Sequence, residues 1–562
     1  MVRRLTQLLE TKVRGLHEAA YLLGIFALLS QLLALVRDRL FAGSFGAGEV
    51  LDTYYASFKI PDFLFVSIAS LVSVYVLIPF LTERLEESKE KTKRMLDSVF
   101  TAFSLMLIAS SLIVFLIAPW LLTILFPGFA NESLDNLVML TRIMLLQPMF
   151  LGISNLIASI TQIRGRFVLY AASPLLYNLG IIFGVLVLYP IMGIAGLAWG
   201  VVFGALMHLL LQVPFVAREG LLPRITTKPS WDIVMQVMKV SLPRTLTLSA
   251  NQITLLLLVS IGSILATGSI SVFQLALNLQ SVPLAIIGVS YSVAAFPTLA
   301  RMFAEGKKSE FVAQIGSAMR HVIFWSLPAL ALVIVLRAQL VRVILGSGEF
   351  NWEATRLTAA GLALFVTSLT AQALVLLLVR GYYAAGNTRK PLIINVLSSV
   401  FAIVSAYALV FIFQSSSSFQ TFIEQLLRVQ GIEGTNVLML PLGYTLGMLI
   451  NAVVLLQLFQ RDYGDLRAIV RPVLWKTGFA SIFASAAAYQ VLSIMDEIVD
   501  INTFWGIFGQ GLAAGVTGML ACLLALYVLK SQELAEAWAA VHHKFWKTKT
   551  VIPEAVEVEQ EG

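Results

Sequence analysis

Charged residues cluster in one short stretch near the start of the chain. The cluster of interest comprises Arg37, Asp38, Arg39, Asp52, Lys59 and Asp62. Arginine offers phosphate a bidentate fork and lysine a point charge, so Arg37 and Lys59 are candidate contacts for an anionic headgroup. Helical spacing would place Asp52, Lys59 and Asp62 on one face, seven and three residues apart. Their spacing therefore predicts a polar site.

Two prolines bear on the same prediction. Pro61 lies between Lys59 and Asp62 and lacks a backbone N–H, so it should kink or unwind a helix there, and Pro283 predicts a second break. Backbone carbonyls freed beside paired charges suit a water-filled cavity. The alternative is a set of interfacial ion pairs at the outer membrane surface, and we interpret Arg39 as an interfacial anchor. Arg142 is a further candidate contact, with snorkelling to the outer interface as its alternative.

The composition excludes most other classes of protein. Of 562 residues, 58% are hydrophobic and only 13% are charged, and mean hydropathy is +0.85. A soluble enzyme, a disordered chain and a disulfide-stapled secreted domain are all excluded. The single cysteine, Cys522, lies in an apolar run and is expected to be a small buried hydrophobe. No P-loop, acidic metal motif or zinc spacing occurs, so we expect no catalytic residues, metal, cofactor or enzymatic activity.

Long apolar segments recur along the whole chain, and each exceeds the roughly 20 residues that a bilayer core requires. Because spans of this length must satisfy their own backbone hydrogen bonds, they predict an all-α integral membrane bundle. About fourteen transmembrane helices are expected, at 16–36, 52–81, 98–126, 137–162, 168–190, 193–216, 232–264, 269–299, 311–345, 355–379, 391–413, 438–459, 472–494 and 504–529.

Charge placement predicts the orientation of these helices. Most of the 39 Lys and Arg residues fall in the two termini and the even-numbered loops, whereas the odd-numbered loops lean acidic. Both termini should therefore be cytoplasmic. Residues 1–15 are basic and precede a span without a cleavage site, so we interpret them as an interfacial segment rather than a signal peptide. The net charge of +7 then reflects topology, and no nucleic-acid footprint is expected.

A weak internal repeat divides the chain. Two groups of residues share one order at an offset of 216–217: Leu140, Thr141, Arg164, Gly165, Pro174 and Asn178, then Leu357, Thr358, Arg380, Gly381, Pro391 and Asn395. Six intervening helices give both copies the same orientation, so two six-helix lobes should be related by a pseudo-two-fold axis along the membrane normal, with a binding site between them. The expected units are an N-terminal lobe (1–217), a C-terminal lobe (218–460), two further helices (461–530) and a cytoplasmic tail (531–562).

Two shorter patterns also predict local structure. Ser415 to Ser418 open an external insertion that we expect to be a flexible loop. Gly196 with Gly200, and Gly443 with Gly447, match the spacing that brings membrane helices into close contact.

Several motifs resemble those of the MurJ (MviN) family. They are Val36-Arg37-Asp38, Phe45-Gly46-Ala47-Gly48, Asp52, Phe58-Lys59-Ile60-Pro61, Leu140-Thr141-Arg142-Ile143-Met144, Arg166-Phe167 with Pro174 and Asn178, and Gly381-Tyr382-Tyr383 with Lys390-Pro391. The resemblance implies a fourteen-helix transporter of the multidrug/oligosaccharidyl-lipid/polysaccharide (MOP) exporter superfamily. It covers most of the first eleven predicted helices, and the order of the motifs carries it more than any single one.

Members of this family flip lipid II, the undecaprenyl-pyrophosphate-linked peptidoglycan precursor, to the outer leaflet of the bacterial inner membrane by alternating access. The resemblance implies cavity positions at Arg37, Asp38, Asp52 and Lys59, coupling to Na⁺, H⁺ or the membrane potential, and a lipid-linked glycopeptide as partner. We expect a monomer.

The chain departs from the family where the family usually has arginines. It has Gln31, an uncharged stretch over 63–73 that includes Val66, and Asn278. The alternative function is therefore a related exporter of another polyprenyl-linked glycan or of an amphipathic drug.

Overall fold

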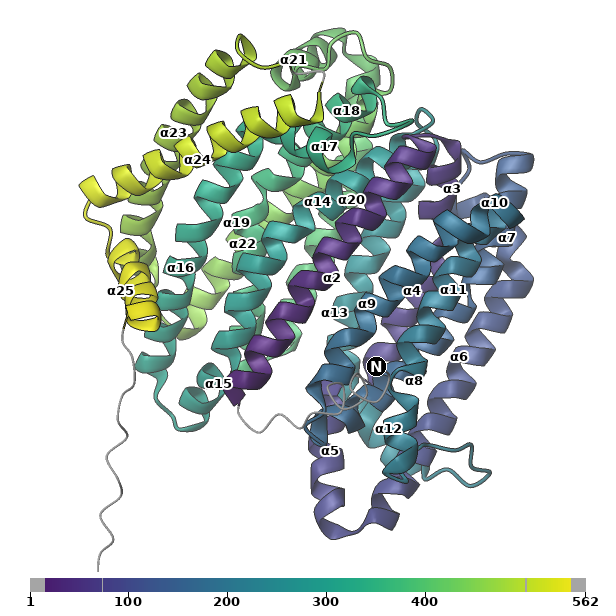
Figure 1. Ribbon diagram of the computed structural model, residues 1–562. Helices are drawn as coiled ribbons and strands as arrows, with labels where there is room; N and C mark the ends of the chain where they lie inside the picture. The colour runs from purple at the N-terminus through teal and green to yellow at the C-terminus, as the bar shows by residue number, and fades with distance from the viewer. Residues whose placement is uncertain (1–15, 73, 501–502, 547–562) are drawn as a thin grey trace, which may run out of the picture.

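The computed structural model describes residues 16–546 except 73 and 501–502, and all regular secondary structure in this part of the chain is helical. The all-α prediction is confirmed. The predicted interfacial segment 1–15 and the end of the tail, 547–562, lie outside the described residues. Figure 1 shows the earlier helices, purple to blue, on one side and the later helices, teal to yellow, on the other.

The first half of the chain forms eleven α-helices and three irregular helical segments. They are α2 (Leu16–Phe45), α3 (Glu49–Ser57), α4 (Lys59–Leu64), η1 (Phe65–Ala69), η2 (Ser70–Val72), α5 (Val74–Glu87), α6 (Lys89–Leu125), α7 (Glu132–Met144), α8 (Leu146–Ile163), α9 (Phe167–Phe183), η3 (Gly184–Leu188), α10 (Tyr189–Met192), α11 (Ile194–Leu210) and α12 (Val213–Arg218).

The second half continues in the same manner. It comprises α13 (Trp231–Ser263), α14 (Ser269–Leu284), η4 (Ala285–Val289), α15 (Ser290–Ala304), α16 (Lys308–Val335), α17 (Arg337–Leu345), α18 (Trp352–Thr367), α19 (Leu369–Ala384), α20 (Arg389–Ser415), α21 (Ser417–Leu427), η5 (Thr435–Leu438), α22 (Met439–Tyr463), α23 (Arg467–Asp496), α24 (Phe504–Val528) and α25 (Gln532–Trp546).

The membrane spans agree closely with those predicted. Among the described residues, twelve helical stretches are long and apolar enough to cross a bilayer, and a thirteenth arises if α18 and α19, bent by 43°, count as one span. The predicted first span, 16–36, lies in α2, which is not among these twelve. However, α2 has 30 residues, and at about 1.5 Å per residue it is longer than the hydrocarbon core is thick.

Contacts between helices follow the two halves of the chain. In the first half α11 contacts α7, α8 and α9, and in the second half α22 contacts α18, α19 and α20. The helices α2, α13 and α14 connect the halves, because α2 contacts α9 and α17, α13 contacts α4 and α6, and α14 contacts α3. The last two spans, α23 and α24, pack against each other and against α16. The pseudo-two-fold axis and the unit boundaries stay predictions.

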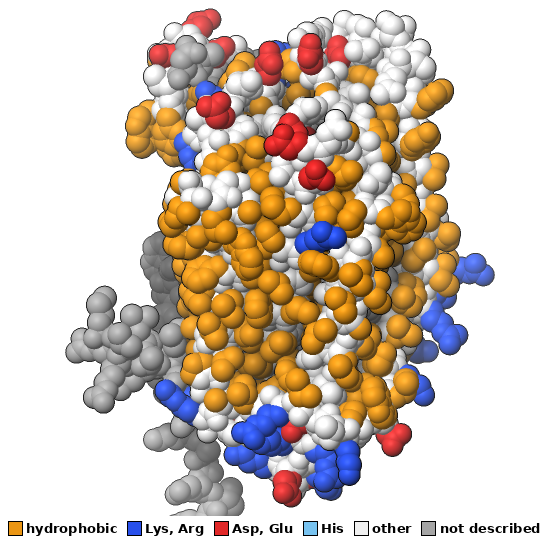
Figure 2. Space-filling model, turned by 90° about the vertical axis from the view of Figure 1, so that its right-hand side faces the viewer, with side chains coloured by type: hydrophobic (Ala, Val, Ile, Leu, Met, Phe, Trp, Pro, Cys, Tyr) orange, Lys and Arg blue, Asp and Glu red, His pale blue; other side chains and the backbone are white. Residues whose placement is uncertain are grey.

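Acidic and basic side chains separate to opposite ends of the molecule. Figure 2 shows acidic side chains at one end, basic side chains at the other, and a hydrophobic band between them. This is the pattern that a transmembrane bundle shows when its loops differ in charge across the bilayer.

Both predicted breaks lie next to irregular helix. Near Pro61 the α-helix is interrupted at Phe58, and a π-helix begins at Phe65. Pro283 lies near the end of α14, directly before the π-helix η4 that starts at Ala285. Each proline removes one N–H donor from the helical ladder, which favours such a local rearrangement. The π-helices η1 and η4 begin 220 residues apart, which is close to the offset of 216–217 residues in the internal repeat.

Glycines let neighbouring helices approach each other closely. A Cβ added at Gly200 of α11 would lie 2.4 Å from the Cα of Gly184, and one at Gly180 would lie 2.2 Å from the Cα of Gly204. In the second half a Cβ at Gly443 would lie 2.6 Å from the Cα of Ala406. The predicted close-packing role of the glycine pairs is confirmed.

The prediction of a flexible loop at Ser415 to Ser418 is wrong. This stretch ends α20 and starts the external helix α21, in which Ser416 accepts the backbone N–H of Phe419 at 3.4 Å as an N-cap. Ile423 and Leu427, four residues apart, are buried in the core. Capping and apolar periodicity outweigh the serine-rich composition.

Replacing Gly200 by alanine should lower the thermal stability of the protein. The added methyl meets backbone atoms that cannot rotate away, and overpacking of this kind costs about 1–3 kcal/mol. Gly478 of α23 is the matched control, because its Cβ would meet nothing within 4 Å, so Gly478→Ala should be neutral or stabilise by up to about 1 kcal/mol. Melting temperatures in one detergent measure both. Equal melting temperatures would contradict the close contact of α9 and α11.

Candidate substrate-binding site

A cavity of about 330 Å³ lies between the two halves of the bundle. Its wall combines residues of α2, α3, α4, α8, α9 and α14, so it joins segments more than 200 residues apart. The polar residues that line it are Arg37, Lys59, Asp62, Gln147, Gln274 and Asn278. The aromatic residues are Tyr54, Tyr55, Phe58, Phe65 and Tyr177. Such an aromatic wall with a few converging polar groups is typical of a ligand site.

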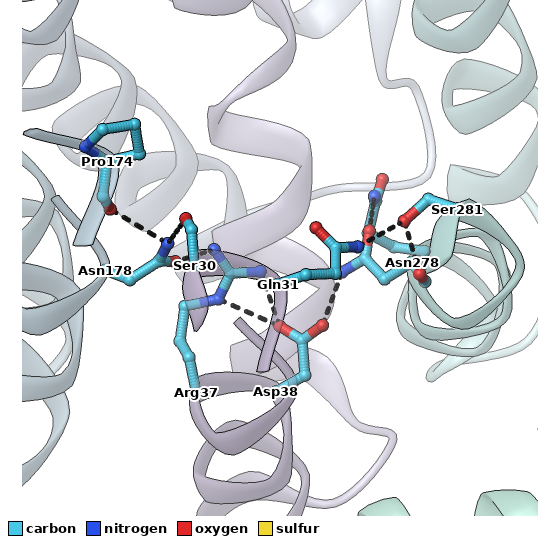
Figure 3. Close-up of polar contacts among 9 residues, drawn as sticks. Ser30, Gln31, Arg37, Asp38, Pro174, Asn178, Asn278 and Ser281 are labelled. Atoms are coloured by element: carbon cyan, nitrogen blue, oxygen red, sulfur yellow. Dashed lines mark hydrogen bonds and ion pairs between the residues drawn. The ribbon is translucent and has the colours of Figure 1, made fainter. Parts of the chain in front are cut away.

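Arg37 and Asp38 form an ion pair in the middle of α2. The Nε and Nη2 of Arg37 donate to Oδ1 of Asp38 at 3.0 and 2.8 Å, and Nη1 donates to Oδ1 of Asn178 on α9 at 2.9 Å. Guanidinium has five N–H groups, so two are left for a ligand. Asp38, which is 3% exposed, accepts from Nδ2 of Asn278 on α14 at 3.0 Å. Figure 3 shows the resulting chain from α9 through α2 to α14.

Amides occupy positions next to this chain. Gln31 donates to the hydroxyl of Ser281 on α14 at 3.2 Å, and Asn178 donates to the carbonyl of Pro174 at 3.2 Å, as Figure 3 shows. Gln31 and Asn278 are two of the positions where the resemblance led us to expect arginine. Here Gln31 bonds a neutral hydroxyl and Asn278 bonds the Asp38 carboxylate, so both hold neighbouring helices and neither adds positive charge to the site.

Lys59 is the second cation of the cavity. Its Nζ donates to Oε1 of Gln274 on α14 at 2.7 Å. Gln274 in turn donates to Asn278 at 2.8 Å. Among the described residues Lys59 forms no ion pair, so the amide of Gln274 is its hydrogen-bond partner and the Asp62 carboxylate one turn away balances its charge at longer range. Two of its three N–H donors are left for an anion.

Asp62 lies one turn after Lys59 on the same wall. Its Oδ1 accepts from Nε2 of Gln147 on α8 at 3.2 Å. The cavity wall therefore presents a cation and an anion side by side, each held by a glutamine from another helix.

Asp52 lies outside the cavity and holds the start of α14 instead. Its Oδ2 accepts the N–H of Gly268 at 2.6 Å, and its Oδ1 accepts the N–H and the hydroxyl of Ser271 at 2.7 and 2.5 Å. A helix N-terminus presents unpaired N–H donors and a partial positive charge, both of which favour a carboxylate. Gly268 has no side chain with which to cap its own helix. Its φ is 90°, and a Cβ added there would lie 2.3 Å from the carbonyl oxygen of Ala47, so this position requires glycine.

Two further contacts join the halves near the same end. Nη1 of Arg39 donates to the carbonyls of Val343 and Ile344 at the end of α17, at 2.6 and 3.1 Å. The N–H of Glu349 donates to the carbonyl of Gly43 at 2.9 Å. Arg39, expected to be an interfacial anchor, thus also caps a helix C-terminus.

Hydroxyl contacts join the halves on the other side of the cavity. Ser241 of α13 donates to the carbonyl of Leu71 at 2.6 Å, and the hydroxyls of Ser70 and Thr245 lie 2.8 Å apart. The halves therefore meet on both sides of the central cavity.

Arg142 does not reach the cavity. On α7 it donates from Nε to the carbonyl of Phe115 on α6 at 3.1 Å, and its guanidinium lies 4.7 Å from the centre of the Phe115 ring. A cation–π contact with a neighbouring helix accounts for its position.

Of the predicted contacts, Arg37, Lys59 and Asp62 line the cavity, and Asp38 is bonded to Arg37. The lining residues that the sequence analysis did not single out are the two glutamines and the three tyrosines, whereas Asn278 was noted as a departure from the family. Asn178, which bonds Arg37, carried a signal because it recurs as Asn395 in the internal repeat.

Comparison with known proteins gives a consistent result. The sequence profile of the lipid II flippase MurJ family matches residues 41–417. The chain is similar to the probable lipid II flippase MurJ of Buchnera aphidicola subsp. Acyrthosiphon pisum, with 30% identity over 66% of this chain and 73% of that protein. It is 25% identical to the lipid II flippase MurJ of Burkholderia cenocepacia, over 65% of this chain and 73% of the relative.

Solved structures show a similar fold. The inward closed conformation of lipid II flippase MurJ aligns with a TM-score of 0.71 at 20% identity, over 90% of this chain and 98% of that one. An inward-facing multidrug resistance MATE transporter of the MOP superfamily aligns with a TM-score of 0.64 at 15% identity, over 79% of this chain and 96% of that one.

Replacing Asp52 by alanine should loosen the contact between α3 and α14. It removes the acceptor of two backbone donors and a hydroxyl, and hydrogen bonds to a charged group contribute about 1.5–3 kcal/mol each. In a Cys522→Ser background, which lacks cysteine, a Ser269→Cys reporter is suitable because Ser269 is 3% exposed. Asp52→Ala should raise its labelling rate by an aqueous thiol reagent about tenfold or more.

Asp52→Asn is the control, because its amide oxygen still accepts one hydrogen bond and the rise should be smaller. Unchanged labelling in Asp52→Ala would mean that this contact does not hold α3 against α14.

Proposed function

The chain belongs to the MurJ family of lipid II flippases, and on that premise we propose that it moves lipid II from the cytoplasmic to the outer leaflet by alternating access. The observation that supports this most is the pair of incompletely used cations in the central cavity. Arg37 of α2 and Lys59 of α4 both line the cavity, and each leaves two N–H donors. A pyrophosphate presents several oxygens that such donors bind well.

The burial of these cations supports binding rather than a purely structural role. Lys59 lies in a span, and its one hydrogen bond is to the amide of Gln274. An ionised side chain inside a membrane is costly, and a ligand that supplies the opposite charge removes this cost. Arg37 is paired with Asp38 and Lys59 lies one turn from Asp62, so both cations would contribute directed hydrogen bonds rather than net charge.

Alternating access requires that the contacts on one side of the cavity break while those on the other form. The contacts of Asp52 with α14 and of Arg39 with α17 involve backbone groups at helix ends. Helix ends can exchange such partners for water, whereas the interior of a helix cannot. The π-helices η1 and η4 follow directly on the cavity-lining segments and are suitable hinge positions.

The charge distribution supports a location in the bacterial inner membrane with both termini cytoplasmic. Helix α2 starts toward the basic end of the molecule (Figures 1 and 2). Helix α25 also lies toward this end. Basic loops remain preferentially on the cytoplasmic side. The acidic end, where Asp52 and Arg39 make their contacts, would then face outward.

We further propose a monomer without a covalent catalytic activity or nucleic-acid partner, driven by Na⁺, H⁺ or the membrane potential. Among the described residues no three His, Cys, Asp or Glu side chains come together as a metal site requires. A coupling ion would therefore be held by fewer acidic groups together with carbonyl or amide oxygens.

The charge balance of the cavity favours one alternative. Arg37 and Lys59 are matched by Asp38 and Asp62, so the cavity region carries no net positive charge. A related exporter of another polyprenyl-linked glycan, or of an amphipathic drug, would suit a neutral cavity with an aromatic wall.

Complementation distinguishes these functions. In a bacterium depleted of its own lipid II flippase, this chain should restore lipid II externalisation, and Lys59→Gln should reduce it at least about tenfold because a charged hydrogen bond to phosphate is lost. Arg142→Gln is the matched control and should retain transport, because Arg142 lies away from the cavity. Immunoblots of membranes check equal levels. Failure of the unmodified chain at normal levels would exclude lipid II and favour the alternative exporter.

A further inference from the structure

Two arginines converge on the point where helix α21 ends. Nη2 of Arg337 on α17 donates to the carbonyl of Leu427 at 2.8 Å. Nε of Arg356 on α18 donates to the carbonyl of Arg428 at 3.2 Å, and its Nη2 donates to the same oxygen. Two guanidinium groups therefore bind adjacent carbonyls at the end of one helix. Helix α21 lies at the acidic end of the molecule (Figures 1 and 2), where cations are few.

Arg428 brings a third guanidinium to the same place. Its Nη2 donates to Oη of Tyr489 on α23 at 3.2 Å, and its guanidinium lies 5.9 Å from the centre of that ring. There it is close enough to Arg337 for their like charges to repel each other. Three positive charges are thus held together by α17, α18 and α23 around the end of α21.

No carboxylate compensates these charges. Within the described ranges, none of the three arginines takes part in an ion pair. Glu424, the acid nearest to Arg428 in the sequence, accepts from Thr435 at 2.7 Å and from Gln420 at 2.9 Å instead. A helix C-terminus carries only about half an elementary negative charge. Most of the positive charge of the cluster is therefore unbalanced.

The arginines keep N–H groups that a ligand can reach. A guanidinium has five, and Arg337 and Arg428 each use one in the bonds described above. Arg428 is exposed, and Arg337 and Arg356 are partly exposed. The cluster is therefore open to an anion from the surface of the protein.

The surface of α21 beside the cluster is suited to lipid. Ile423 and Leu427 are buried against the protein, but Phe422 and Leu426, on the same apolar arc of the helix, are 59% and 61% exposed. The protein thus covers only one side of this arc. Amphipathic helices of this kind lie in the membrane interface, with their apolar side toward the acyl chains.

Aromatic side chains place the cluster at the depth of the lipid headgroups. Tyr489, which contacts Arg428, lies about half exposed on the span α23, and Trp352 lies about half exposed one turn before Arg356. Tyrosine and tryptophan are enriched where a membrane protein crosses from the hydrocarbon core into the headgroup region. An anion at this depth is most simply the phosphate of a phospholipid.

We propose that Arg337, Arg356 and Arg428 bind the headgroup phosphate of an anionic phospholipid in the outer leaflet, with α21 lying on that leaflet. Guanidinium groups bind phosphate through paired hydrogen bonds, and three unbalanced charges favour a headgroup with net negative charge. The inference rests on the proposed orientation of the chain, but not on the transport of lipid II.

A purely structural role accounts for two of the arginines. Arg337 and Arg356 satisfy carbonyls that have no partner within α21. It does not account for Arg428, whose side chain bonds no carbonyl of α21 and adds a third charge beside Arg337. The contact with Tyr489 holds this charge close to the other two. Arg428 is therefore the residue that distinguishes an anion site from a helix cap.

Photocrosslinking tests the proposal at this one place in the protein. The full-length protein in a neutral detergent is titrated with a short-chain phosphatidylglycerol that carries a diazirine in its headgroup, and the crosslinks within residues 417–428 are quantified by peptide mass spectrometry. Arg428→Gln should raise the half-saturating lipid concentration about fivefold, the factor that one arginine contributes near an anionic lipid surface. Arg428→Lys keeps the charge and should stay within about twofold of the unmodified protein.

Arg142→Gln is the matched control and should leave crosslinking of 417–428 unchanged. Arg142 makes the same kinds of contact, with a backbone carbonyl and an aromatic ring, but on α7 in the other half of the chain. Arg428→Gln and Arg428→Lys both lose the arginine contact with Tyr489. The difference between them therefore reports the charge, even if both variants melt at a lower temperature.

Unlabelled competitors identify the source of the phosphate. Phosphatidylglycerol should displace the probe, and phosphatidylcholine with the same chains should do so less well. The proposal is overturned if inorganic phosphate or undecaprenyl pyrophosphate displaces the probe at lower concentration than phosphatidylglycerol. It is also overturned if Arg428→Gln binds the probe as tightly as Arg142→Gln. Loss of lipid II transport in complementation, with this crosslink intact, would contradict the proposed function and leave the lipid site standing.

Discussion

The ion pair of Arg37 and Asp38 is the interaction on which the centre of the bundle depends. No water is available in a bilayer core to solvate either charge, so each must find its partners within the protein. Asp38 neutralises Arg37 within one helix, and the remaining bonds reach Asn178 on α9 and Asn278 on α14. A single buried pair thereby connects both halves of the chain. Removing one member would leave the other charged and unpaired, which is far more costly than the pair itself.

Helix ends carry the other polar connections between the halves. Asp52 satisfies the first N–H groups of α14, and Arg39 satisfies the last carbonyls of α17. These groups lack partners within their own helices, so long-range capping stabilises the contact without disturbing the helical ladder. These contacts lie at helix ends, so the halves can meet or part there while the helices stay intact. This suits a transporter whose two sides open in turn.

The cavity departs from a simple cationic site. Gln31 and Asn278 are uncharged at positions where the family resemblance led us to expect arginine. The charge of Lys59 is balanced by Asp62 one turn away. Lower net charge weakens the attraction for a bare anion, but amides and tyrosines offer directional hydrogen bonds that a purely cationic wall lacks. Selectivity would then come from the neutral part of the ligand as much as from its phosphates.

The all-helical membrane fold was predictable from the sequence alone, because spans of about 20 apolar residues can satisfy their backbone only as helices. Local spacing identified Lys59 and Asp62 as neighbours on one face, and the presence of a charge in a membrane segment singled out Arg37. The serine-rich composition before α21 suggested a flexible loop, but this segment is helical. The N-cap at Ser416 and the burial of Ile423 and Leu427 stabilise the helix.

Only the tertiary structure revealed the partners of these residues. Gln147, Gln274 and Asn278 reach the cavity from 85 to 240 residues away along the chain, and no local pattern encodes such contacts. Asp52 illustrates the same limit. Its spacing from Lys59 suggested a cavity residue, but the start of α14 lies against it, and two unpaired N–H groups bind its carboxylate more favourably than an open cavity could. Spacing determines which side chains share a face, and helix packing determines what that face meets.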